Sequence, residues 1–382
     1  MSDTASTRVA QLDGLRGLAI GLVLLFHYGV AFAGNRILGP IISEGWIGVD
    51  LFFVMSGFLI GGIVIAKRDA ANFYSVFYLR RILRIFPLYY MLLLVVAVAA
   101  AWGWMPRSRI PLGLYAAYLQ NIATALTHDY GLAWLQVTWS LAVEEQFYLL
   151  LPILVAVMPR KFLGHVLLLG VFIAILCRIS GYLIPVEYPR DFARFFTLCR
   201  IDDLFYGVLL ALAVRNEAVA AIIRKHRTLF TLGMLFLLFG FLAVSAFDSQ
   251  GGNEMLTCTI GLTLLGPLFL CVVVLAVMHE GSLVSSLAKG RILGWIGRRA
   301  YAIYLFHMPV IVSLEAIYRR YQFLHFGAAL VLPALMMTFS LAAASWHFLE
   351  SPLINIGHRR SYGRGAKTVA FNRAEGIEPA VP

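Results

Sequence analysis

The sequence predicts an all-α fold class: a polytopic helical membrane protein with about ten transmembrane helices. Composition is the first observation behind this, because the 382-residue chain is 60% hydrophobic and only 13% charged, against roughly 25% charged in soluble domains. The second is a series of apolar runs that approach the ~20 residues needed to cross a bilayer. The third is that the Lys and Arg residues collect between those runs. A soluble fold of this size would leave too much apolar area in water.

Ten apolar runs are predicted to span the membrane: 16–33, 48–66, 87–104, 139–158, 162–183, 198–214, 228–247, 256–277, 300–317 and 327–349. The segment 112–126 is too short to cross, and we expect it to be interfacial or re-entrant. Residues 1–356 are thus expected to form one transmembrane domain. Residues 357–382 are polar, Gly-rich and basic, which predicts a disordered cytoplasmic tail.

The Lys and Arg residues are distributed unevenly between the two sides, and cytoplasmic segments carry the excess in membrane proteins. With the N-terminus inside, 22 of the 31 fall on the cytoplasmic side and 7 on the other, while Arg178 and Arg200 lie within spans. Both termini are therefore predicted to be cytoplasmic. The net charge of +11 then reflects contact with membrane lipids, and no nucleic-acid partner is expected.

Arg16 and His27 lie eleven residues apart on the first predicted span. Eleven helical residues make three turns plus about 20°, so both side chains point to one face, about 16 Å apart along the axis. Arg16 at the cytoplasmic entrance could hold the phosphates of a long anionic donor. His27, deeper in the membrane, could act as a general base where the reactive end lands. The alternative is an anchoring arginine and a histidine that bonds between helices.

Asp50 begins the second predicted span, and only a short loop joins that span to the first. Its carboxylate could therefore reach His27, orient the imidazole and stabilise its cationic form, as in a catalytic triad. An equally open interpretation is that Asp50 caps the N-terminus of its own helix.

Arg80, Arg81 and Arg84 lie just before the third predicted span, near the inner surface. Arg81 and Arg84 are three residues apart and share a helix face. These arginines could bind the phosphates of a nucleotide-like donor. The alternative is contact with lipid headgroups and control of topology.

A further set of polar residues is predicted to bind the acceptor: Glu144, Glu145, Arg200, Asp202, Asp203, Tyr304 and His307. Adjacent residues of a helix point about 100° apart, so at most one of the two glutamates faces a given cavity. The arginine and the two aspartates at the head of the sixth span could instead form an ion pair, and the tyrosine and histidine could serve only packing.

The cysteines and histidines give no sign of a metal centre. The four cysteines lie in or beside apolar runs without a C-x-x-C pair, and the nine histidines include no H-E-x-x-H pattern. We therefore expect no disulfide framework, no metal site and no permanently bound cofactor.

Seven segments, taken in order, resemble the acyltransferase-3 family of bacterial membrane acyltransferases: LDGLRGLAIGLVLLFH (12–27), GWIGVDLFFVMSGFLI (45–60), FYLRRILRIFPLYY (77–90), WSLAVEEQFYLLLP (139–152), RIDDLFYGVLLA (200–211), YAIYLFHMPV (301–310) and FLESP (348–352). Each segment alone is a weak signal, whereas the ordered set is specific. The resemblance covers residues from about 10 to 355.

The resemblance implies a ten-span protein of the bacterial cytoplasmic (inner) membrane that moves acyl groups, commonly acetyl from acetyl-coenzyme A, onto sugars, lipids or antibiotics. Glycan acceptors of the family often lie outside the membrane. The family's essential Arg and His correspond to Arg16 and His27, and its Arg-x-x-Arg to Arg81 and Arg84. It implies an O-acyltransferase with acyl-coenzyme A as co-substrate and a carbohydrate or lipid acceptor. Because the chain stops soon after the tenth span, we expect it to lack the periplasmic SGNH-type domain of some members.

Two other classes of protein share parts of this pattern. A charge-lined helical bundle could be a transporter or flippase of a glycan or lipid, although no inverted repeat or matched pair of broken helices is evident. In a non-catalytic membrane scaffold, a buried His27 and Asp50 would be a needless cost. The sequence leaves open the acceptor, the length of the acyl chain, the oligomeric state and the choice between direct transfer and an acyl-histidine intermediate.

Overall fold

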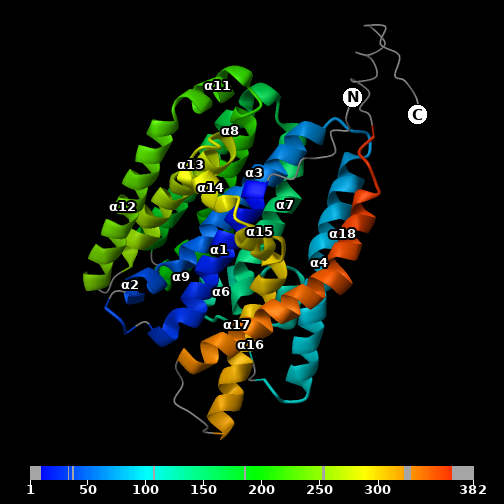
Figure 1. The fold of residues 1–382 in the computed structure, drawn as a ribbon, viewed down its shortest axis with the longest axis vertical. Coiled ribbons are helices and arrows are strands. Elements are labelled where there is room, and N and C mark those ends of the chain that lie inside the picture. Colours follow the sequence, from blue (N-terminus) through cyan, green and yellow to red (C-terminus); the bar gives the residue numbers. More distant parts are fainter. Residues whose placement is uncertain are drawn as a thin grey trace.

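The computed structural model describes residues 10–363 except 33, 37, 106–107, 185, 252–253 and 322–327. Every regular element within these ranges is a helix (Figure 1). Nine helices of the described chain are long and apolar enough to cross a membrane, or ten if one bent pair counts as a single span. The prediction of a polytopic helical membrane protein is therefore confirmed.

The long helices are α1 (Ala10–Tyr28), α3 (Gly48–Lys67), α4 (Phe73–Ala101), α7 (Trp139–Val157), α8 (Arg160–Leu183), α12 (Arg227–Gly251), α13 (Leu262–Met278), α16 (Ala300–Tyr321) and α17 (Ala328–Ser345). The shorter helices are α2 (Leu38–Ser43), α5 (Leu112–Ala116), α6 (Gln120–Thr127), α9 (Pro189–Phe195), α10 (Ile201–Ala213), α11 (Glu217–Lys225), α14 (Leu283–Ala288), α15 (Arg291–Arg298) and α18 (Ser351–His358). Short 3₁₀ turns precede α3, α7 and α10, and π-helical turns precede α13 and α18.

Glycines set the closest helix contacts in the centre of the bundle. A Cβ on Gly57 of α3 would lie 1.9 Å from the carbonyl oxygen of Leu204 on α10, and one on Gly207 of α10 would lie 2.1 Å from that of Val54. Only glycine allows two backbones to approach so closely, which is how small residues join helices in membranes. This contact fixes which face of α3 meets the start of α10.

Several predicted spans have other bounds than the observed helices, and the first, predicted over 16–33, is α1 at Ala10–Tyr28. The third, predicted from residue 87, begins fourteen residues earlier, since α4 starts at Phe73; the arginine-rich segment before Pro87 therefore continues the helix. The sixth consists of α10 alone, which is followed by α11 after a bend of 106°. The segment 112–126, predicted not to cross, forms only the short helices α5 and α6.

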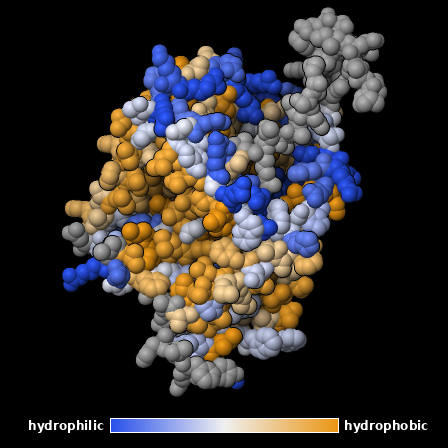
Figure 2. Space-filling view, in the orientation of Figure 1, coloured by the Kyte–Doolittle hydropathy of each residue, from blue (hydrophilic) through white to orange (hydrophobic). Residues whose placement is uncertain are grey.

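The surface has the distribution expected for a membrane protein. Figure 2 shows hydrophilic residues gathered at the end of the molecule that carries α11, and a broad hydrophobic surface over α12. Many apolar side chains of α12 face outward, with Leu229, Phe236 and Phe239 exposed by 64%, 75% and 66%. Such surface is stable only against lipid.

The predicted tail falls partly outside the described residues. Helix α18 extends to His358 and packs beside α4 (Figure 1). Beyond it, the carbonyl of Ser361 accepts a bond of 3.0 Å from Asn72 Nδ2, and Tyr362 stacks on Phe73. Residues 364–382 are not described, so disorder of the tail stays a prediction.

Candidate active site

A cavity of about 620 Å³ lies among α1, α3, α4, α7, α15, α16 and α18. Its wall contains five arginines, namely Arg16, Arg80, Arg81, Arg84 and Arg298. Three acidic residues, Asp13, Glu144 and Glu350, also line it. The four arginines predicted to bind the donor are thus brought together from two helices that are distant in the sequence. The lining side chains carry a net positive charge, which suits a ligand with several negative charges.

The arginines differ in how they are held. Arg16 Nη1 lies 3.7 Å from Asp13 Oδ1 on the same helix. Arg80 donates a 2.6 Å bond to the carbonyl of Arg360, and its guanidinium lies 4.9 Å from the ring centre of Tyr362. Arg81 is half-buried, and its buried Nε has no hydrogen-bond partner among the described residues; Arg84 lines the same cavity. Clustering like charges in a membrane is unfavourable unless an anion joins them.

The two adjacent glutamates of α7 have different environments. Glu144 lines the cavity and accepts bonds of 2.7 Å from Ser56 Oγ and 3.0 Å from the Tyr148 hydroxyl. Glu145 is not part of that wall, and its buried Oε1 has no hydrogen-bond partner within the described part of the chain. The expectation that only one of them faces a given cavity is met. However, Glu144 shares its cavity with the arginines assigned to the donor, so the structure gives no separate acceptor site there.

His27 lies against a second histidine. The ring centres of His27 and His307 are 4.9 Å apart. His27 Nδ1 is 3.0 Å from the carbonyl oxygen of Val23, and His307 Nδ1 is 2.7 Å from that of Tyr304. His307 is fully buried, and its Nε2 has no partner among the described residues. Neither ring lines the arginine cavity.

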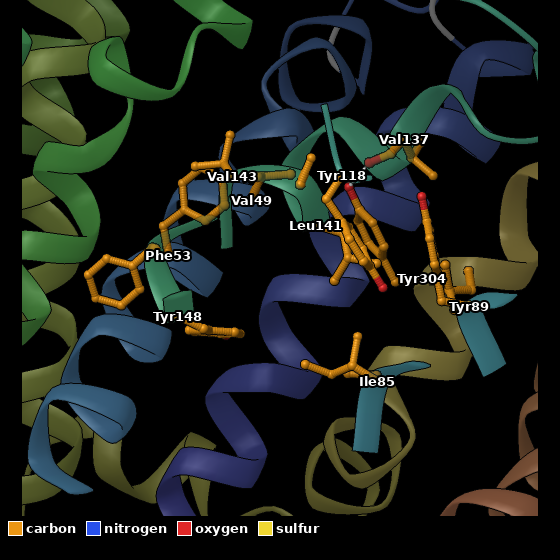
Figure 3. Close-up of a cluster of buried hydrophobic side chains, with 14 of the residues drawn as sticks. Val49, Phe53, Ile85, Tyr89, Tyr118, Val137, Leu141, Val143, Tyr148 and Tyr304 are labelled. Carbon is orange, nitrogen blue, oxygen red and sulfur yellow. Dashed lines mark hydrogen bonds between the residues drawn. The ribbon is translucent and has the colours of Figure 1, made fainter. Parts of the chain in front are cut away.

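Tyr304 connects the cavity to this histidine pair. It lines the cavity, and its ring centre is 5.5 Å from that of His307. Its hydroxyl donates to the carbonyl of Val137 at 2.7 Å and lies 2.6 Å from Ser140 Oγ. Figure 3 shows the ring among Val137, Leu141 and the other apolar side chains of this cluster. Contacts therefore run from the cavity wall through Tyr304 to His307 and then to His27.

Asp50 does not have the predicted partner. It is fully buried and forms an ion pair with Arg200 Nη2, at the head of α10. The short loop does bring Asp50 near the first span, but the glycine contact between α3 and α10 turns its side chain toward the arginine. A buried carboxylate gains more from a guanidinium than from a neutral ring. The residue found beside His27 is His307, which sequence reasoning had placed with the acceptor.

The residues at the head of α10 form an ion-pair network. Arg178 of α8 binds Asp202 through two bonds, of 3.0 Å and 2.7 Å, while Arg200 lies 3.4 Å from Asp203. All four side chains are at most 2% exposed, and none lines the arginine cavity. The structure therefore favours the ion-pair alternative over acceptor binding for Arg200, Asp202 and Asp203.

Sequence reasoning missed several members of the cavity wall. Ser56, Ser140, Tyr148 and Tyr301 are polar side chains in apolar runs, and Glu350 directly follows the last run; in a membrane helix such a residue is itself a functional signal. Among the described residues, no three His, Cys, Asp or Glu side chains gather as they would around a metal ion. The four cysteines are free.

Together the fold and the cavity define a class: a multi-pass helical membrane protein with an arginine-lined cavity near two contacting histidines, of which His307 is fully buried. The chain belongs to the acyltransferase-domain family, whose pattern matches residues 9–347. It is similar to the peptidoglycan O-acetyltransferase OatA of Listeria monocytogenes, with 28% identity over 366 residues, covering 90% of this chain and 56% of that protein. It is also similar to the O-acetyltransferase OatA of Staphylococcus aureus, with 26% identity over 381 residues, covering 94% and 60%.

The chain thus spans less than two thirds of the length of these relatives. No solved structure matches it. Membership in an acyltransferase family gives the arginine cavity and the histidine pair a chemical context, namely the transfer of an acyl group.

Proposed function

We propose that the protein is an O-acyltransferase that moves an acyl group, acetyl first among the candidates, from coenzyme A to a hydroxyl of a glycan or lipid. The observation that carries this proposal is the arginine-lined cavity connected through Tyr304 to His307 and His27. Coenzyme A carries several phosphates, and arginine forks match phosphate geometry. The names of the relatives, which include a peptidoglycan O-acetyltransferase, support acetyl as the group and a carbohydrate as the acceptor.

In the proposed reaction the guanidinium groups of Arg16, Arg81 and Arg84 hold the phosphates, and the acyl thioester points toward the histidines. His27 takes the proton of the acceptor hydroxyl, because a hydroxyl is a weak nucleophile at neutral pH. The hydroxyl oxygen bonds to the acyl carbon as the carbon–sulfur bond breaks. The imidazolium then returns its proton to the departing thiolate, so that protons balance. An acyl-histidine intermediate would use the same groups.

The proposed orientation places the cavity mouth on the cytoplasmic side of a bacterial cytoplasmic membrane. Its support is the uneven distribution of Lys and Arg, 22 against 7, and cytoplasmic loops carry such an excess. Acyl-coenzyme A would then enter from the cytoplasm, and a glycan would arrive from outside.

Topology is directly testable with reporter fusions. A reporter that is active only in the cytoplasm, fused after Gly363, should be active, and one fused after Gly34 in the loop between α1 and α2 should be silent. A reporter active only outside should give the reverse pattern. An external signal from the fusion after Gly363 would contradict the proposed orientation.

Donor binding should depend on the cavity arginines. Arg81→Ala and Arg16→Ala should each weaken binding of coenzyme A by roughly 10–150-fold, because a hydrogen bond to a charged group contributes about 1.5–3 kcal/mol. Calorimetric titration of the purified protein measures this directly. Arg224→Ala is the matched control, since Arg224 lies on α11 and pairs with Glu217. If both cavity variants bind coenzyme A like the control, the donor site lies elsewhere.

A transporter is the competing class of protein. A transporter would move the acceptor across the membrane without transferring an acyl group to it. Among the described helices a single bent pair, α10 with α11, resembles the broken spans of transporters. Purified protein given acetyl-coenzyme A separates the two classes. Release of free coenzyme A together with an acetylated acceptor supports the enzyme. If neither product forms with a range of hydroxyl acceptors, the result supports transport.

A further inference from the structure

A second cavity, of about 340 Å³, lies at the ends of α3, α8 and α10 and shares no residue with the first. Three of its seven lining residues are arginines, Arg68, Arg160 and Arg215, and the others are apolar. The acid beside it is Asp69, which lies 2.6 Å from Arg160 and 3.8 Å from Arg68. The three arginines of the cavity and the adjacent Asp69 therefore carry a net positive charge together.

The protein backbone holds two of these arginines in place. Arg215 donates bonds of 2.6 Å to the carbonyl of Ala211 and 2.5 Å to that of Gly62. Arg68 donates a longer bond, of 3.4 Å, to the carbonyl of Met158. A guanidinium has five N–H groups, so these anchoring bonds leave donors for a ligand. Anchored arginines lose less side-chain freedom when they bind an anion.

The apolar side of the cavity is formed by three helices, and one of them, α8, has an outer face that meets lipid. Ile65, Leu163 and Leu212 line the cavity. On the sides of α8 turned away from Leu163, Phe162, Leu168 and Phe172 are exposed by 48%, 55% and 56%. A ligand that fits both parts has an anionic head and hydrocarbon chains.

We propose that this cavity binds the phosphate headgroup of an anionic phospholipid, with the acyl chains lying along α8. Basic pockets between transmembrane helices on the cytoplasmic side bind anionic lipid headgroups, and the ends of α3, α8 and α10 belong to the basic side of the chain. A free phosphate would use the arginines but gain nothing from the apolar surface. The lipid contacts three helices and so stabilises their packing. This proposal does not depend on the acyltransferase chemistry.

The test is thermal unfolding of the full chain, purified in a neutral detergent, with added phosphatidylglycerol. The unfolding midpoint should rise and saturate with phosphatidylglycerol, because a ligand that binds only the folded state stabilises it. Phosphatidylcholine with the same acyl chains and inorganic phosphate should give no such saturating rise. Native mass spectrometry should show one phosphatidylglycerol retained per chain under the same conditions.

Two variants locate the site. Arg215→Gln and Arg160→Gln should each weaken phosphatidylglycerol binding by roughly fivefold. Arg224→Gln, an exposed arginine outside the cavity, should bind like the unaltered protein. Arg215→Gln loses the bonds of Arg215 to the backbone and could be destabilised for that reason. Arg160 is 69% exposed, so Arg160→Gln should still fold. An equal effect of phosphatidylcholine or of inorganic phosphate, or unchanged binding by Arg160→Gln, would overturn the proposal.

Discussion

Replacing His27 with alanine should lower acyl transfer by roughly 10²–10⁴-fold, the usual contribution of a positioned general acid or base. The protein should still fold and bind coenzyme A, because His27 lies outside the arginine cavity. The rate of acetyl transfer by purified protein, measured beside coenzyme A affinity, separates the two effects. His165→Ala is a suitable control, since His165 lies on the exposed side of α8.

Near-normal transfer by His27→Ala would show that another group acts as the base. His307 would then be examined first, because its ring contacts that of His27 and its buried Nε2 has no partner in the part of the chain that the structure describes. If His27 is the base, His307→Gln should slow transfer less than His27→Ala does, and coenzyme A affinity should stay unchanged. A loss of donor affinity in either histidine variant would place the rings in the donor site.

Asp202→Ala should lower the free energy of unfolding by roughly 3–5 kcal/mol, the cost of leaving one partner of a buried ion pair without the other. Arg178 would lose both bonds to this carboxylate while remaining buried in the bundle. Denaturant unfolding in detergent measures the change. Glu217→Ala removes an exposed partner of Arg224 and should change stability little.

A double variant tests whether the cost comes from the unpaired charge. Arg178→Met combined with Asp202→Leu removes both charges, and apolar replacement of a buried pair is often neutral or stabilising. The double variant should therefore be more stable than Asp202→Ala alone. Equal destabilisation of the two would show that packing around Arg178, and not charge pairing, holds this region together. The same reasoning applies to Asp50, which pairs with Arg200. Asp50→Asn should weaken this ion pair and lower the free energy of unfolding, and it should not change the orientation of His27.

The features that sequence predicted well depend on local spacing. Apolar length defined most of the spans, and the spacing of Arg81 and Arg84 placed both on one face of α4, where both line the cavity. Helical geometry likewise predicted that Glu144 and Glu145 would have different environments. These inferences need only the rise and turn of a helix.

The features that sequence missed depend on how helices are rotated and arranged against each other. A short loop limits the distance between two spans but leaves their rotation open, so Asp50 could not be assigned to Arg200 rather than His27. The contact of His27 with His307 joins α1 to α16, which are separated by most of the chain. Arg80 and Tyr362 meet only because α18 runs beside α4.

The hydrogen bonds of Tyr304 bear on how such a protein keeps its membrane sealed. Its hydroxyl is held by Ser140 and Val137 where the cavity approaches the histidines. If donor and acceptor reach one reaction centre from opposite sides, an unobstructed path between them would conduct protons and discharge the membrane potential that the cell maintains. In such a protein, a bulky ring held by two hydrogen bonds at this position would obstruct the passage of water and ions between the cavity and the histidines.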